Sequence, residues 1–234
     1  MITPRVLKRA GLLLPVLALT SSGLLADPVT CRTGSGCLNG TDYFDWAANF
    51  GPTFTTVPNG PTALSHSGSE SAVVGFAQSV GQRRDESNGW WGNFSPGEAL
   101  LWTEGDGPLT FLFNNPLSGL GASIQADYYG GFTALLQVYN SGGTLIDSIS
   151  ENGYSNGSNN GSAIFIGLNN DSGITKAVFS LSSATYGTVG DFAIDQLDVV
   201  PASAPEPTSI LLISSALAGL AVFGRKRLLK VVRC

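Results

Sequence analysis

Apolar residues recur at every second position in many short segments of this chain, and this alternation constrains the fold more than any other feature. In the run from Phe132 to Tyr139, for example, the side chains at 132, 134, 136 and 138 are apolar, and polar residues stand between several of them. A period of two places one set of side chains on the buried face of a β-sheet. Between the two chain ends, no long stretch has the period of a helix. We therefore expect one all-β domain over residues 27–200, which is large enough to bury a core.

Turn-forming residues divide this domain into short strands. We expect about ten strands, near Phe54 and over 72–76, 99–103, 109–113, 122–129, 132–139, 144–150, 163–168, 174–181 and 192–200. The turns between them are expected at 106–108, 114–116, 141–143 and 169–173, where Gly, Pro, Asn and Asp cluster. Short strands with frequent turns are typical of two-sheet β-sandwiches. We expect a jelly roll, with an immunoglobulin-like sandwich as the alternative.

Both ends of the chain have the composition of targeting segments. Residues 1–26 begin with basic side chains, continue with an apolar stretch and end with mostly small, uncharged residues, the three regions of a secretory signal peptide. Near the other end, residues 208–224 carry no charge, and as a helix they would reach ~25 Å, close to the ~30 Å of a bilayer core. The basic tail, residues 225–234, favours the cytoplasmic side of a membrane. We expect an exported domain with a C-terminal transmembrane helix.

A proline-rich linker, residues 201–207, stands between the domain and this helix. Two prolines flank one carboxylate in it and favour an extended, exposed conformation. The linker motif and the basic cluster behind the helix consist of Pro205, Glu206, Pro207, Arg225, Lys226 and Arg227. An ordinary membrane anchor behind a proline-rich linker is the alternative interpretation of this order.

The order of motif, apolar helix and basic cluster closely resembles the PEP-CTERM sorting signal of Gram-negative bacteria that make exopolysaccharide. The resemblance implies that an exosortase, a membrane transpeptidase similar to cysteine proteases, recognises the Pro-Glu-Pro motif. It also implies a precursor anchored in the inner membrane, and then a protein that is released or transferred to the outer surface or the extracellular matrix. The chain continues further beyond the basic cluster than this family pattern leads us to expect.

The charge of the expected domain limits its partners. Only Arg32, Arg83, Arg84 and Lys176 are basic between residues 27 and 207, against 17 carboxylates, which gives a net charge of −13. Such a surface repels phosphate backbones, so we do not expect a nucleic acid as partner.

The cysteines and acidic residues predict little metal chemistry. Cys31 and Cys37 are close in sequence in an exported segment, and we expect them to form a structural disulfide. We expect no metal or other cofactor, with one alternative left open. Asp191 and Asp195 are two candidate calcium ligands, because they share one face of a strand and jelly-roll sugar-binding domains often hold a structural calcium.

Catalytic patterns are sparse, and we expect no enzyme. His66 is the sole histidine and lies between two serines with no nucleophile-elbow pattern. A glycoside hydrolase needs only two carboxylates ~5–10 Å apart. Glu98 and Glu104, on either side of Trp102, are the pair to test for this alternative. The simpler interpretation places them at the solvent-facing ends of a strand.

Aromatic residues are the candidates for binding, because their rings stack on the C–H faces of sugars. The candidates are Trp90, Trp91, Trp102, Tyr128, Tyr129 and Tyr154. In a strand, neighbours such as Tyr128 and Tyr129 point to opposite faces, so at most one of each pair is easily placed in the core.

The pattern of residues 90–199 is similar to that of many PEP-CTERM ectodomains. Its segments Phe165–Gly167 and Asp191–Asp195 also resemble strands of galactose-binding-like and carbohydrate-binding-module jelly rolls. These resemblances imply a surface or matrix protein that is structural or associated with carbohydrate, with extracellular polysaccharide as the partner that they suggest. A surface hydrolase of polysaccharide and an adhesin that binds protein are the alternatives.

Overall fold

The computed structural model describes residues 29–31, 35–38, 42–57, 62–65, 71–76, 81–85, 90, 93–95 and 97–202. The expected signal peptide, the Pro-Glu-Pro motif, the apolar C-terminal segment and the basic tail lie outside these residues, as do His66 and Trp91. None of the helices in the described part of the chain has the length and apolar character needed to cross a membrane.

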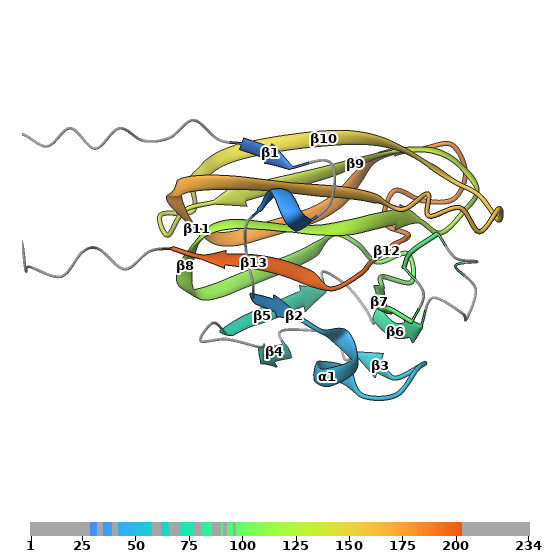
Figure 1. The fold of residues 1–234 in the computed structure, drawn as a ribbon, viewed down its shortest axis with the longest axis horizontal. Coiled ribbons are helices and arrows are strands. Elements are labelled where there is room, and N and C mark those ends of the chain that lie inside the picture. The colour runs from blue at the N-terminus through green and yellow to red at the C-terminus, as the bar shows by residue number, and fades with distance from the viewer. Residues whose placement is uncertain are drawn as a thin grey trace, which may run out of the picture.

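The described chain is almost entirely β-strand, and every strand pair is antiparallel (Figure 1). Two helices interrupt the strands, the 3-10 helix η1 (Ser35–Cys37) and the α-helix α1 (Trp46–Phe50). The strands are β1 (Val29–Cys31), β2 (Asp42–Phe44), β3 (Thr56–Val57), β4 (Thr62–Ser65), β5 (Ser71–Phe76), β6 (Gly81–Asp85), β7 (Ala99–Trp102), β8 (Leu109–Ala126), β9 (Gly130–Tyr139), β10 (Leu145–Ser155), β11 (Ile164–Ala184), β12 (Phe192–Ile194) and β13 (Leu197–Pro201). The prediction of an all-β antiparallel domain is confirmed.

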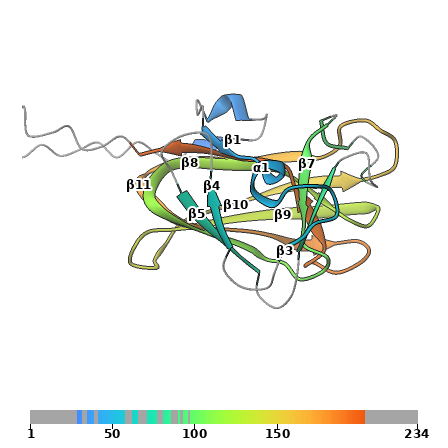
Figure 2. The same ribbon diagram turned by 90° about the horizontal axis from the view of Figure 1, so that it is seen from below.

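The strands form two layers, but these are joined in one continuous 13-stranded sheet. The first layer contains β10, β9, the second half of β11, the first half of β8, β5 and β4. The second layer contains β1, the first half of β11 and the second half of β8, with β12 and β13 on the other side of β8. Figure 2 shows β8 and β11 curving together from one layer into the other. The expectation of two separate sheets is therefore corrected, because these two long strands belong to both layers.

Two of the predicted turns are wrong, and both lie where the long strands bend. Residues 114–116 are inside β8 and residues 169–173 are inside β11. The register between the two strands shifts between Asn169 and Ile174. A Cβ on Gly173, whose φ is +78°, would lie 3.4 Å from the Cβ of Pro116, so the two residues face each other at the bend. Proline and glycine disturb the ladder here without ending the strands, which produces a corner.

Helix α1 was not predicted, because its five residues are too few to show a helical period. Its ends nevertheless carry local signals. The Asp45 carboxylate accepts a hydrogen bond from the backbone N–H of Ala47 at 2.7 Å, which caps the first turn. Gly51, with φ at +76°, ends the helix. The helix thereby places Trp46 in the core, where its ring stacks on Phe111 with the ring centroids 5.9 Å apart.

One hydrophobic core lies between the two layers. The first layer supplies Phe111, Phe113, Phe132, Leu136, Val138 and Phe179, and the second supplies Leu120, Ile124, Ile166, Leu168, Phe192, Ile194, Leu197 and Val199. The alternation predicted for residues 132–139 is confirmed, because Phe132, Ala134, Leu136 and Val138 are all buried. The rings of Phe111 and Phe179 meet edge to face at 6.0 Å, so neighbouring strands contribute to the same contact.

The outer face of the second layer is also covered by side chains. Phe165 points away from the core, because its neighbour Ile166 points into it, and packs with Leu38 next to η1. Ala193 and Leu100 likewise face outward and pack with Trp90 and Phe94. This layer therefore has apolar contacts on both faces.

The contact between Phe111 and Phe179 gives a prediction for stability. We expect Phe179→Ala to lower the free energy of unfolding by about 3–5 kcal/mol, because it removes a fully buried ring from between the layers. Leu112→Ala is the matched control: this neighbour of Phe111 is 49% exposed, and its change should stay within about 0.5 kcal/mol. Urea unfolding of both variants measures the difference, and equal losses would contradict the assigned core.

Candidate functional site

A row of short polar side chains crosses the outer face of the first layer near the start of β9. Thr133 on β9 pairs with Asn152 on β10 and with Ser183 on β11. The Thr133 hydroxyl donates a hydrogen bond to the Asn152 side-chain oxygen at 2.9 Å, and the Ser183 hydroxyl donates to the Thr133 hydroxyl oxygen at 2.9 Å. The three strands thus present a connected set of hydroxyl and amide groups.

These residues line an open groove of about 330 Å³, which we call the β9 groove. Its lining residues are Gly131, Phe132, Thr133, Asn152, Gly153, Ser183, Ala184 and Thr185. The Thr185 hydroxyl donates to the carbonyl oxygen of Gly131 at 2.8 Å, which holds the chain after β11 against β9. None of the described residues that line the groove is charged. The groove therefore offers neutral hydrogen-bonding groups to a ligand.

Four tyrosines of the described chain surround this end of the first layer, and each is more than half exposed. Tyr128 is 52% exposed, Tyr129 53%, Tyr154 62% and Tyr186 65%. Tyr154 on β10 is the registered partner of Gly131. On the other side of β9, Tyr186 lies beside Gly130, because a Cβ built there would be 3.1 Å from its ring. Tyr154 and Tyr186 therefore stand on opposite sides of the glycine pair that begins β9.

Tyr128 and Tyr129 are supported by glycines of two neighbouring loops. A Cβ on Gly187 would lie 2.2 Å from the Tyr128 ring, and a Cβ on Gly157 would lie 2.6 Å from the Tyr129 hydroxyl oxygen. Each tyrosine thus has one side against a loop, and about half of its surface faces solvent. The strand predicted to reach Tyr129 ends at Ala126, so these two tyrosines do not point to opposite faces of a sheet and both are exposed.

The two described tryptophans among the predicted ligand-stacking residues, Trp90 and Trp102, are buried or partly buried. Trp90 is only 3% exposed and meets Phe94 edge to face at 5.7 Å, so it is a packing residue. Trp102 is partly buried, and its indole N–H donates to a carboxylate oxygen of Asp191 at 2.7 Å. Trp91 lies outside the described residues. Trp90 is therefore wrong as an exposed stacking residue, since it is buried against Phe94, Leu100 and Ala193.

The sequence interpretation missed most of the β9 groove. The alternation along β9 places Thr133 on the outer face, so this residue was accessible to sequence reasoning. Ser183 and Thr185 were not, because a register shift between Leu181 and Ser183 decides which side chains of β11 face outward. Tyr186 carried no signal of its own in the sequence.

The carboxylates of Asp191 and Asp195 each accept a hydrogen bond from a different donor. Asp191 accepts from Trp102, and one carboxylate oxygen of Asp195 accepts from the backbone N–H of Ser123 at 2.6 Å. Within the described part of the chain, no three His, Cys, Asp or Glu side chains gather closely enough to hold a metal ion. Asp191 and Asp195 therefore do not form part of a group of three acidic or other metal-binding side chains among the described residues, and calcium binding by them stays a prediction.

Asp195 is a buried acid in a negative environment. It is 7% exposed, and its carbonyl oxygen accepts a hydrogen bond from the Trp46 indole. Burial raises the pKa of the Asp195 carboxyl well above its ordinary value, and the negative charges of Glu98 and Asp198 raise it further, whereas the hydrogen bond from Ser123 opposes the shift. Asp195 therefore holds its proton more tightly in the folded chain.

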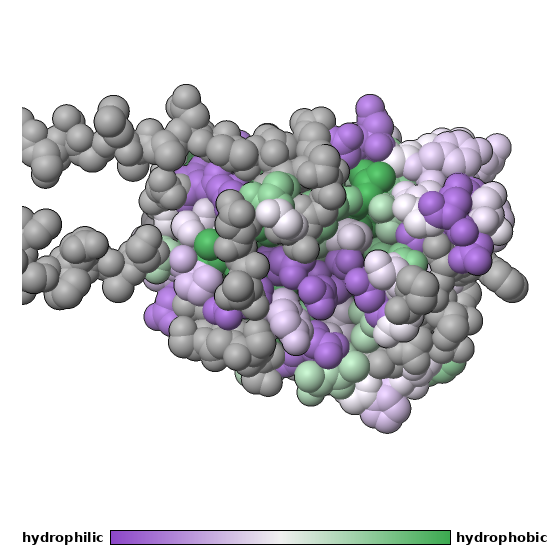
Figure 3. Space-filling view, viewed as in Figure 1, coloured by the Kyte–Doolittle hydropathy of each residue, from purple (hydrophilic) through white to green (hydrophobic). Residues whose placement is uncertain are grey.

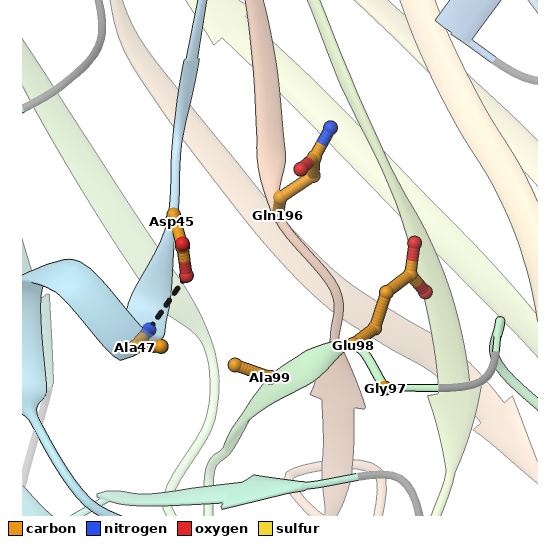
Figure 4. Close-up of a pocket in the computed structure, with 6 residues that line it drawn as sticks. All are labelled: Asp45, Ala47, Gly97, Glu98, Ala99 and Gln196. Atoms are coloured by element: carbon orange, nitrogen blue, oxygen red, sulfur yellow. Dashed lines mark hydrogen bonds between the residues drawn. The ribbon is translucent and has the colours of Figure 1, made fainter.

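Glu98 and Glu104 do not face each other across a cleft. They lie at opposite ends of β7, which spans ~13 Å of extended chain. Glu98 lines a small pocket of about 190 Å³ with Asp45 and Gln196, and Glu104 does not line it. Figure 4 shows Asp45 turned toward Ala47, to which it is hydrogen-bonded, while Glu98 and Gln196 extend away from Ala99. The two glutamates that we considered as a catalytic pair for glycoside hydrolysis therefore lie next to the two ends of one strand, as in the simpler interpretation.

Cys37 is disulfide-bonded. The backbone of Cys31 ends β1, and its side chain lies outside the described residues. The pairing of Cys31 with Cys37 stays a prediction.

The burial of Asp195 gives a prediction for pH dependence. Its pKa is higher in the folded than in the unfolded chain, so its contribution to stability is greatest below the unfolded pKa and is lost as the pH rises through the folded pKa. Asp195→Asn keeps an acceptor for Ser123 and has no charge to bury. We expect this variant to be more stable than the parent protein at neutral pH and to lose the advantage in acid, measured by urea unfolding at several pH values. An asparagine variant that is less stable at every pH would contradict this assignment.

Comparison with known proteins adds two distant structural likenesses. No known protein family matches the sequence, and no curated protein matches it either. A DUF4465 family protein from Bacteroides caccae aligns with a TM-score of 0.35 and 11% identity, over 75% of this chain and 100% of that one. The module CsCBM6-3 from Clostridium stercorarium, solved in complex with cellobiose, aligns with a TM-score of 0.31 and 13% identity, over 64% of this chain and 98% of that one. Neither TM-score is high enough to carry an argument about this chain.

Proposed function

We propose that this protein is an exported, non-enzymatic surface or matrix protein that binds neutral carbohydrate in the β9 groove. The observation that carries the proposal is the combination of an uncharged hydroxyl and amide groove with four exposed tyrosines around one end of the first layer. The antiparallel two-layer arrangement supports it, since it leaves the outer face of β10, β9 and β11 open to a ligand.

The chemistry of the groove matches that of a sugar. A sugar ring presents hydroxyl groups around its edge and C–H groups on its faces. Thr133, Asn152, Ser183 and Thr185 offer partners for the hydroxyl groups. An aromatic ring such as Tyr154 or Tyr186 offers an apolar face for the C–H groups while its own hydroxyl group stays in water. A few fixed polar groups beside apolar surface are the usual composition of a small-molecule site.

Charge favours a neutral ligand over an anionic one. The expected domain carries a net charge of −13, and no described residue of the groove is basic. Lys176, on the same strand as Ser183, lies about 20 Å along β11 from the groove, and its ammonium group sits 4.2 Å from the centre of the Tyr139 ring. Polyanions such as nucleic acid or acidic polysaccharide would therefore meet repulsion with no compensating cation at the site.

On the face drawn in Figure 3, the described residues do not favour the adhesin alternative. Figure 3 shows one face of the molecule, on which the apolar patches of the described residues are small and are separated by polar residues. Protein-binding sites are commonly marked by larger contiguous apolar patches.

Export and sorting complete the proposal. They rest on the signal-peptide pattern of residues 1–26 and on the PEP-CTERM resemblance of the last 30 or so residues, with an exosortase as the processing partner. The domain would then meet polysaccharide at the cell surface or in the matrix, where it would act as a structural component without turning the polymer over.

The groove is tested by binding to neutral oligosaccharides. We expect the full chain, purified in a detergent without a sugar head group, to bind at least one member of a panel of neutral hexasaccharides in titration calorimetry. Tyr154→Ala and Tyr186→Ala should each weaken binding by about 1 kcal/mol, or several-fold, through the loss of one aromatic contact. Tyr43→Ala, which removes an exposed tyrosine from β2, is the matched control and should bind normally. A chain that binds no member of the panel would refute the proposal.

Sorting is tested separately in a host that carries an exosortase. Changing Pro205 and Glu206 to Ala should leave the precursor in the inner membrane with its tail attached, because the transpeptidase no longer finds its motif. Membrane fractionation and the mass of the protein measure this result. Release of the variant at the normal rate would show that the motif is not recognised.

A further inference from the structure

One glycine in the β9 groove lacks a structural reason to be glycine. Gly131 does not have a left-handed backbone, and a Cβ built on it would meet only the Thr185 hydroxyl oxygen, at an ordinary contact distance of 3.4 Å. Its neighbours differ from it. Gly130 has φ at +122°, and a Cβ built on it would lie 3.0 Å from the Thr185 side chain, while a Cβ on Gly153 would enter the Phe132 ring. Those two glycines are required by the fold, whereas the fold would accept a side chain at position 131.

Glycine at position 131 makes the sheet less stable than a β-branched residue would. Gly131 lies inside the β10-β9-β11 ladder, paired with Tyr154 on one side, and its carbonyl oxygen accepts the backbone N–H of Thr185 on the other at 2.8 Å. Glycine weakens a strand interior, where β-branched residues are favoured. A glycine that neither conformation nor packing requires often marks a place where a ligand approaches the backbone closely.

The surroundings of Gly131 define what could approach. Tyr154 on β10 and Thr185 after β11 flank it at one strand spacing on each side, which leaves ~10 Å between their backbones. Thr133 and Asn152 lie two residues further along the same outer face. The space over Gly131 therefore has the Tyr154 ring on the β10 side and the Thr185 hydroxyl group on the β11 side. The side chains of Thr133 and Asn152 border it further along β9 and β10.

We propose that Gly131 is the floor of a subsite that receives the face of one neutral sugar ring, between Tyr154 and the Thr185–Tyr186 segment. This inference rests on the proposed carbohydrate binding and adds its specificity-determining position. The missing side chain lets the ring lie against the backbone of β9, while its hydroxyl groups reach Thr133, Asn152 and Thr185. A side chain at position 131 would occupy the place of the ring.

The test separates binding from folding. In the full chain, Gly131→Val should leave the urea midpoint unchanged or raise it, and should weaken binding of the neutral hexasaccharide probes at least tenfold. Gly131→Ala, which adds one carbon atom, should weaken binding less. Ser148→Val introduces the same side chain at an exposed position of β10 on the same face, outside the groove, and should bind normally.

The possible results decide between the two proposals. If the parent chain binds and Tyr154→Ala weakens binding, but Gly131→Val binds like the parent, the subsite at Gly131 is refuted and carbohydrate binding stands. If Gly131→Ala lowers the urea midpoint clearly, glycine is there for the fold and the subsite is again refuted. If the parent chain binds no probe, the proposed function itself fails. Stronger binding of an oligogalacturonate probe than of every neutral probe would refute the neutral ligand class.

Discussion

The pairing of β8 with β11 is the interaction on which the rest of the structure depends. Both strands run through two layers, and their shared corner, with Pro116 facing Gly173, turns one sheet back upon itself. Because the ladder is continuous, the core side chains of both layers are fixed relative to each other by backbone hydrogen bonds as well as by packing. Phe111 and Phe179 belong to this pair of strands and also form the centre of the aromatic contacts, so the corner and the core support the same geometry.

The same pairing positions the β9 groove through one irregularity in register. Leu181 pairs with Ala134, but the next registered pair is Ser183 with Thr133. Without this bulge, Ala184 would take the outer position beside Gly131, and Thr185 would move on to Gly130. With the bulge, Ala184 packs against the core and Thr185 bonds to Gly131. One extra residue in β11 thus places the hydroxyl groups of Ser183 and Thr185 on the outer face, which is the usual effect of a bulge beside a functional site.

The fold class and part of the groove could be predicted because they depend on short-range patterns. The alternation along β9 was sufficient to assign its buried face and, by exclusion, the outward position of Thr133. Tyr128 and Tyr129 stood out as an adjacent pair. The corner could not be predicted, because Asn, Pro and Gly favour turns locally and only the pairing of two distant segments keeps Pro116 and Gly173 inside strands. For the same reason the burial of Trp90 was missed: Trp90 and Phe94 pack on Ala193 of β12, which the sequence alone does not place beside them.

The two outer faces of the domain differ in the side chains that they present. The second layer is covered by Phe165 with Leu38, and by Trp90 and Phe94 over Ala193, and it holds the buried carboxyl of Asp195 close to Ser123. These contacts stabilise the layer and cover part of its outer face. Beside them lies an open hollow of about 380 Å³, whose lining includes Asn93, Ser123 and Asn159. On the first layer, the outer positions of β10, β9 and β11 around the groove carry short polar side chains, and four exposed tyrosines, Tyr128, Tyr129, Tyr154 and Tyr186, lie around one end of it. The groove for which we propose sugar binding thus lies on the layer opposite the apolar contacts of Phe165 and Trp90, so we expect substitutions in the groove to leave the packing of the core unchanged.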